Sequence, residues 1–103
     1  MAVTPEVDAK TIGRLYAERV RDNRAVQSVH VRETPDWLEV WVVTVPIDVV
    51  DEEPLFEAGV ALRDLYPGAR ILIRLANPRH FPDDYDMVRD VVPSRAEAVS
   101  IPA

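Results

Sequence analysis

The residue types that carry acid–base, nucleophilic or metal chemistry are sparse in this 103-residue chain. There is no cysteine, which excludes a disulfide framework, thiolate metal ligands and a cysteine nucleophile. The two histidines, His30 and His80, are far apart, and no two strong ligands lie at i, i+4 spacing on a predicted helix. The serines lack the flanking glycines of a nucleophile elbow, and the three glycines are too dispersed for a phosphate-binding loop. We therefore expect no catalytic residue, no metal site and no cofactor, and both histidines facing solvent.

Acidic residues are more numerous, and most of them have a structural explanation. Glu52 and Glu53 stand where negative charge favours the first turn of a helix. The aspartates between positions 83 and 86 suit another helix start or a solvated loop. Asp36 and Glu39 are more informative, because they lie where a turn enters the most apolar segment of the chain.

That segment, residues 38–45, is apolar on both faces of any strand it forms. Successive side chains of a strand point to opposite sides, so Leu38 and Val40 face one way, whereas Trp41 and Val43 face the other. A strand that is apolar on both sides is normally central in its sheet and covered above and below. We therefore expect this strand to form the middle of the sheet.

The N-terminal half predicts a helix and a second strand beside this one. A first helix begins at Thr4-Pro5-Glu6, with Thr4 as its cap, and fades near Asp22. Gly13 inside that helix indicates a close packing contact. Residues 27–34 alternate between apolar and polar side chains, which is typical of a half-buried strand, here at an edge. The turn at Pro35 makes the two strands an antiparallel hairpin.

The second half of the chain predicts a helix, a strand and a short tail. Asp51 is the expected cap of the helix, which ends at Pro67-Gly68. Residues 69–76 have the pattern of a third strand. A strand, a helix and a strand in this order imply a right-handed crossover and a parallel pair. In the tail we expect a short helix that begins at Pro82 and a short strand over residues 96–101.

These elements predict a single domain over residues 1–103, with an α/β fold of the two-layer α+β kind. The expected order is α-β-β-α-β, with a small mixed sheet and a short C-terminal helix or strand. Two helices cover one face of this sheet. The other face, to which Trp41 or Val42 contributes, must be covered by the C-terminal segment, by a second copy of the chain or by a different protein.

Composition narrows the range of partners and locations. Twelve basic residues against eighteen acidic ones give a net charge of -6, which disfavours nucleic acid as the main partner. No apolar stretch approaches the ~20 residues of a membrane-spanning helix. The first residues lack the basic start and apolar core of a signal peptide. We therefore expect a cytoplasmic protein that binds neither nucleic acid nor membranes.

The element order and the strand Trp37-Leu38-Glu39-Val40-Trp41-Val42-Val43 resemble the small nucleotidyltransferase-like domains. The segment Leu65-Tyr66-Pro67-Gly68-Ala69-Arg70-Ile71 is similar to the approach to their third strand. The resemblance covers the chain from the first helix to about Ala76, on motifs of low specificity. In that superfamily the second strand carries two carboxylates, spaced by one residue, that hold the catalytic metal ions.

The chain departs from that pattern at the residues that matter for catalysis. When Glu39 is aligned with the second carboxylate, Trp37 takes the place of the first, and the third strand offers Arg74 instead of an acid. The Gly-Ser turn that grips the nucleotide phosphates is missing from residues 26–34. One glutamate cannot hold two metal ions roughly 4 Å apart. The resemblance therefore implies a degenerate, catalytically dead nucleotide site at Asp36, Glu39 and Arg74.

Two functions from different classes follow. The one we prefer is a non-catalytic protein-interaction or regulatory module, such as an antitoxin-like or accessory subunit, that acts through a protein partner or self-association. Aromatic and arginine side chains are enriched in such interfaces, and the candidate interface residues are Trp37, Trp41, Arg79, His80, Phe81 and Tyr85. The alternative is a small nucleotide-binding or nucleotidyltransferase-like enzyme with an atypical site at the three residues named above.

Overall fold

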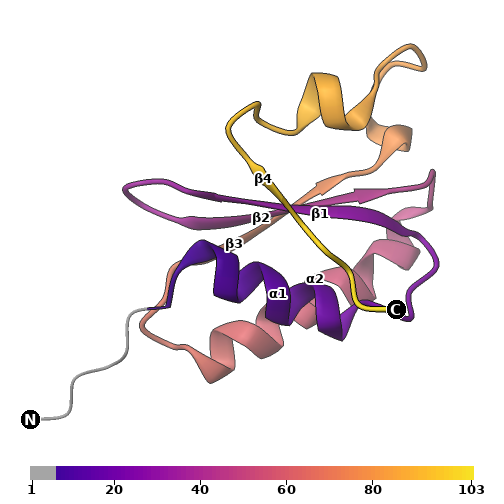
Figure 1. The fold of residues 1–103 in the computed structure, drawn as a ribbon. Coiled ribbons are helices and arrows are strands. Elements are labelled where there is room, and N and C mark those ends of the chain that lie inside the picture. Colours follow the sequence, from indigo (N-terminus) through magenta and orange to yellow (C-terminus); the bar gives the residue numbers. More distant parts are fainter. Residues whose placement is uncertain (1–6) are drawn as a thin grey trace, which may run out of the picture.

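The structure, a computed structural model, describes residues 7–103 and contains a four-stranded mixed sheet with two α-helices on one side (Figure 1). The elements in chain order are α1 (Ala9–Arg19), β1 (Val26–Glu33), β2 (Leu38–Thr44), α2 (Val49–Leu65), β3 (Ile71–Ala76), the short helices η1 (Pro78–His80) and η2 (Met87–Val91), and β4 (Glu97–Val99). The α+β two-layer fold that the sequence predicts is confirmed.

Strand β2 lies at the centre of the sheet, whose order is β3-β2-β1-β4. Strand β1 pairs antiparallel with both β2 and β4, whereas β3 runs parallel to β2. Every residue of β2 is buried except Trp41, which is half-buried. The predicted central strand, the hairpin and the parallel pair are therefore confirmed.

Helices α1 and α2 cover one face of the sheet and form the main core with it (Figure 1). Its fully buried side chains include Ile12 and Tyr16 of α1, Leu55 of α2 and Val40 of β2. The Tyr16 hydroxyl donates a hydrogen bond to the Leu55 carbonyl oxygen at 2.7 Å. Burial raises the pKa of Tyr16, so the phenol stays protonated and remains a donor inside the core.

The opposite face of the sheet, called the second face below, is covered at one end by the C-terminal segment (Figure 1). Met87 and Val92 of this segment are buried and pack with Val43 of β2 and Ala76 of β3. The half-buried Trp41 borders the same cluster. Of the three covers that the sequence allows, the chain's own tail therefore serves for this part of the face.

Strand β1 is not the edge strand that its alternating pattern predicts. After η2 the chain returns to the sheet, and β4 pairs with the outer side of β1, with Val29 opposite Val99 and His30 opposite Ala98. The expected terminal strand is therefore present, but it is only three residues long. A pattern that short does not tell which edge it joins, and the edge prediction for β1 was wrong for that reason.

Helix α1 begins at Ala9, with Asp8 as its N-cap. The Asp8 carboxylate accepts a hydrogen bond from the Thr11 amide at 2.7 Å, and this bond holds the pKa of Asp8 below its ordinary value. The predicted cap Thr4 and the start at Pro5-Glu6 lie outside the described residues. The described start of α1 thus uses the same kind of cap, an oxygen that accepts from the exposed amides of the first turn.

Two later helix boundaries also differ from expectation. The N-cap of α2 is Asp48 and not Asp51, which lies in the first turn. The helix ends at Leu65, whose side chain is 60% exposed. In the tail, the helix expected from Pro82 is replaced by the π-helical turn η2, whose N-cap Asp86 accepts from the Arg89 amide at 2.9 Å.

Two glycines let the helices approach the sheet closely. Gly13 of α1 faces Val31, and Gly59 of α2 faces Ile73. A Cβ atom on either glycine would overlap the branched side chain opposite it. The close contact predicted at Gly13 is confirmed, and Gly59 makes the equivalent contact for the second helix.

In Gly59→Ala the added methyl group must displace Ile73 or shift α2, which costs about 1–3 kcal/mol. Alanine favours a helix over glycine by roughly 1 kcal/mol, so the free energy of unfolding is expected to fall by up to about 2 kcal/mol. Gly68→Ala is the matched control, since no atom lies within 4 Å of its Cβ position and its φ is not positive. Urea unfolding measures both variants. Equal stability of the two would contradict the close contact.

Candidate functional site

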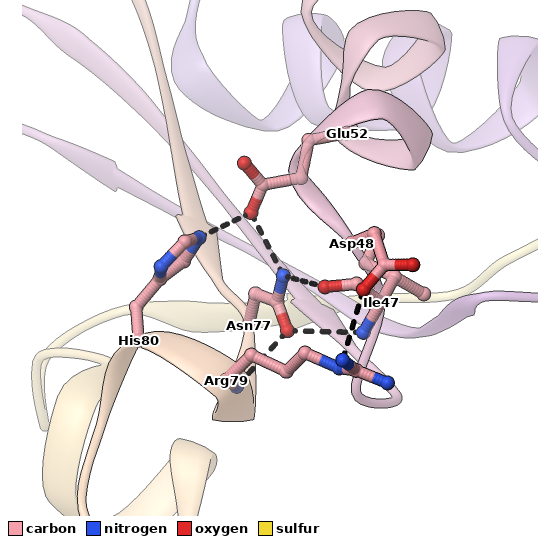
Figure 2. A network of polar contacts seen from close by, with 6 residues as sticks. All are labelled: Ile47, Asp48, Glu52, Asn77, Arg79 and His80. Atoms are coloured by element: carbon pink, nitrogen blue, oxygen red, sulfur yellow. Dashed lines mark hydrogen bonds and ion pairs between the residues drawn. The ribbon is translucent and has the colours of Figure 1, made fainter.

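A network of polar side chains lies at the carboxyl ends of the parallel strands β2 and β3 (Figure 2). Asn77, the residue after β3, is fully buried. Its Oδ1 accepts from the amides of Ile47 and Arg79, both at 3.2 Å. Its Nδ2 donates to the Ile47 carbonyl oxygen and to a Glu52 carboxylate oxygen, both at 2.8 Å. All the donor and acceptor groups of this amide are therefore engaged.

Glu52 connects this network to a histidine. It lies in the first turn of α2, as the sequence predicts, but it is only 7% exposed and is hydrogen-bonded inside the network. Its Oε2, which accepts from Asn77, also lies 2.8 Å from His80 Nε2. The His80 side chain is 46% exposed, so one edge of the ring is held and the rest meets solvent.

The arrangement of Glu52 and His80 could move a proton, but a catalytic pair also needs a group to act upon. Among residues 7–103, no serine, threonine or tyrosine side chain is hydrogen-bonded to His80. On the outer side, Arg79 forms an exposed ion pair with Asp48 at 2.9 Å, which adds little stability. The network therefore joins η1 to the start of α2 and to the loop at Ile47. Two of the candidate interface residues, Arg79 and His80, belong to it.

A second charged group lies on the second face of the sheet. Glu39 is 6% exposed, and its Oε1 accepts from Arg32 Nε at 2.8 Å and from Trp41 Nε1 at 3.1 Å. The Arg74 guanidinium lies 5.9 Å from the centre of the Trp41 ring, a cation–π distance. Trp41 therefore brings Glu39 and Arg74, two residues of the expected nucleotide site, into one neighbourhood.

The third residue of that site, Asp36, lies elsewhere. It lines an open surface hollow of about 1060 Å³ between the hairpin turn and the end of α2, together with Trp37, and neither Glu39 nor Arg74 lines this hollow. Within residues 7–103, no group of three or more His, Asp or Glu side chains is arranged to hold a metal ion. The side chains near Glu39 thus favour a structural ion pair over a metal site.

His30 is buried, at 8% exposure, and the expectation that it faces solvent was wrong. The reason is its place on β1, which lies between β2 and β4, so that its cross-strand partners are Trp41 and Ala98. Its Nε2 lies 2.9 Å from the Ser28 hydroxyl oxygen. Burial lowers the pKa of His30, since water no longer solvates the charged ring.

The aromatic candidates for an interface lie in two regions of the molecule. Trp37 is 42% exposed in the hairpin turn, whereas Trp41 lies on the second face. The rings of Phe81 and Tyr85 stack at a centroid distance of 6.1 Å, and Phe81 packs against the core under the C-terminal segment. Trp37 therefore lies apart from the other aromatic candidates, of which Trp41 and Phe81 border the same buried cluster.

Sequence reasoning missed an exposed apolar row on α2. Val49, Phe56 and Val60 are 69%, 44% and 49% exposed, and intervals of seven and four residues place them on one side of a helix. We call these three residues the α2 stripe. The buried residues Leu55 and Leu62 occupy another side, so α2 is apolar in two directions. A helical-wheel projection of residues 49–65 shows both apolar rows.

Comparison with known proteins finds no match: no protein-family model, no curated protein and no solved structure corresponds to this chain. The resemblance to nucleotidyltransferase-like domains therefore stays a prediction. In the described part of the chain, no helix combines the length and the apolar character needed to cross a membrane.

Asn77→Ala is expected to lower the free energy of unfolding by about 2–4 kcal/mol, because buried groups of Ile47 and Glu52 lose their partner. The matched control is Asn23→Ala, which removes one hydrogen bond to the Ala25 amide at a half-buried position. That change should cost about 1 kcal/mol or less. If urea unfolding shows that the two variants lose similar free energies of unfolding, the Asn77 network does not stabilise the fold as we expect.

The burial of His30 is expected to make stability depend on pH. The pKa of His30 is lower in the folded chain than its ordinary value of 6.5, so the unfolded chain binds a proton first as the pH falls. The free energy of unfolding should therefore be highest above about pH 6.5 and decrease as the pH falls through the lowered pKa. His30→Gln should flatten this region in urea unfolding. Parallel pH profiles for the variant and the wild type would refute the assignment.

Proposed function

We propose that this chain is a protein-interaction module that acts without catalysis, as a regulatory, antitoxin-like or accessory subunit. The observation that carries the proposal is the α2 stripe. When another surface covers exposed apolar side chains, the free energy falls by about 25 cal/mol for each Å² of apolar area removed from water. A row of three such side chains along one helix is therefore a natural docking surface.

The dimensions of the stripe support this function. Val49 and Val60 are eleven positions apart, which corresponds to roughly 16 Å along a helix. Phe56 lies between them, and aromatic side chains of this kind are the usual anchors of protein interfaces. The stripe is long enough to be covered by one strand or one helix of another chain.

The charged side chains support the non-catalytic part of the proposal. The buried carboxylates Glu39 and Glu52 are both hydrogen-bonded to neighbouring side chains. Arg74 lies over the Trp41 ring. A catalytic pair would also need a nucleophile within hydrogen-bonding distance of the residue that the carboxylate orients, and among residues 7–103 no serine, threonine or tyrosine side chain is hydrogen-bonded to His80.

Charge and location complete the proposal. The net charge of -6 favours association with proteins over nucleic acid, since nucleic acid carries the same sign. We place the protein in the cytoplasm. Its proposed action requires neither nucleic acid nor a membrane.

Phe56→Glu is expected to remove the chain from the complex that it forms in its native host. The added carboxylate must be desolvated wherever the stripe is covered, so binding should weaken by at least about a hundredfold. Val88→Glu is the control, because Val88 is 48% exposed and lies on η2. Native mass spectrometry of the tagged chain gives the stoichiometry. A wild-type chain that is isolated as a free monomer would contradict the proposal.

The nucleotide alternative is tested on the same purified protein. Titration calorimetry with magnesium and each nucleoside triphosphate should release no binding heat. A magnesium-dependent heat that Glu39→Gln abolishes would instead establish the alternative site at Glu39.

A further inference from the structure

The outer edge of β3 is open over most of its length. In the parallel pair, the Leu38 amide donates to the Arg70 carbonyl oxygen, so Arg70 and every second residue after it turn their backbone groups toward β2. Ile71, Ile73 and Leu75 therefore turn theirs outward. Arg63 Nε donates to the outward carbonyl oxygen of Ile71 at 2.9 Å. Within residues 7–103, the outward backbone groups of Ile73 and Leu75 have no hydrogen-bond partner.

The α2 stripe lies along this open edge. Gly59 of α2 rests directly on Ile73 of β3, which places the middle of the helix over the middle of the strand. Helix α1 lies over β1 and β2, so it covers the other flank of α2. Phe56 and Val60 therefore project over the side of β3 that has no neighbouring strand.

We propose that a second copy of this chain docks on this surface, with β3 pairing antiparallel to β3 and the two α2 stripes packed together. This inference rests on the proposed function and names the partner. Such a dimer has an eight-stranded sheet with four helices on one face. Its interface is isologous, because the same residues contribute from both copies.

A single twofold axis satisfies both the strand and the helix. With the axis at Ile73, the outward groups of Ile73 face those of Ile73 in the second copy, and Ile71 faces Leu75. Two antiparallel α2 helices related by the same axis bring Phe56 of one copy against Val60 of the other. The midpoint between these two positions of the helix is Ala58. Because the residue after Ala58, Gly59, contacts Ile73, the two midpoints lie at the same level.

The charges on α2 fit the same arrangement. Arg63 is the single basic residue of the helix. It lies five positions after Ala58, and Glu53 lies five positions before Ala58. Each end of the helix pair therefore brings Glu53 of one copy near Arg63 of the other. The acids Glu57 and Asp64 lie further toward solvent, where salt screens their repulsion.

Sedimentation equilibrium of the purified chain tests the inference without any other protein. We expect a reversible monomer–dimer equilibrium in which Val60→Glu weakens the dimer by at least about a hundredfold. Val88→Glu is the matched control, because Val88 and Val60 have nearly equal exposure, 48% and 49%. It should leave the equilibrium unchanged. Circular dichroism checks that both variants are folded.

Amide hydrogen exchange by NMR tests the strand pairing itself. In the dimer, the Ile73 and Leu75 amides should be protected, and this protection should be lost on dilution and in Val60→Glu. A chain that is monomeric up to about 500 μM overturns the inference. So does a dimer in which these two amides exchange freely. If that monomer still binds a different protein through Phe56, the proposed function stands and only the identity of the partner is wrong.

Discussion

The fold depends on removing both faces of β2 from water. Each side of that strand presents branched or aromatic side chains, and burying one such side chain is worth roughly 1.5–3 kcal/mol. One layer of helices can meet only one face. The chain must therefore supply a second cover, and it does so with the segment that carries Met87 and Val92. The return of this segment across the sheet also delivers β4 to the open side of β1. Covering the second face and extending the sheet thus result from a single chain reversal.

Backbone groups just beyond the ends of β2 and β3 also need partners, and the polar network meets that need. Where β3 ends, the chain leaves the sheet while still buried, and an unpaired buried amide or carbonyl costs about 1–3 kcal/mol. Asn77 satisfies Ile47 on both its amide and its carbonyl, and it holds the Glu52 carboxylate beside His80. The hydrogen bonds among the residues with the most suggestive chemistry therefore also connect the ends of β2 and β3 to the start of α2. A buried glutamate beside a histidine is a common pattern in active sites, but among residues 7–103 no serine, threonine or tyrosine side chain is hydrogen-bonded to His80.

The sequence predicted what depends on periodicity and on connection rules. The two-sided strand 38–45, the hairpin at Pro35 and the parallel crossover follow from local patterns, and all three are present. What could not be predicted depends on contacts between distant residues. His30 is buried between Trp41 of β2 and Ala98 of β4, and β4 pairs over three residues only. The role of Glu52 requires Asn77, twenty-five positions later. The α2 stripe was missed for a different reason: the same helix carries a buried stripe, and a count of apolar residues does not separate the two.

The two edges of the sheet differ in a way that bears on association. Natural sheets protect their edges with short strands, charges or covering elements, because an exposed long edge invites pairing with another chain. Strand β4 follows this rule, since it is three residues long and carries Glu97. Strand β3 is six residues long. Its one charged residue, Arg74, lies over the Trp41 ring, and Arg63 covers only the carbonyl of Ile71. An apolar row on α2 lies beside this unprotected edge, where protection would call for charged residues. Both the backbone and the side chains therefore favour extension of the sheet at β3 and oppose it at β4.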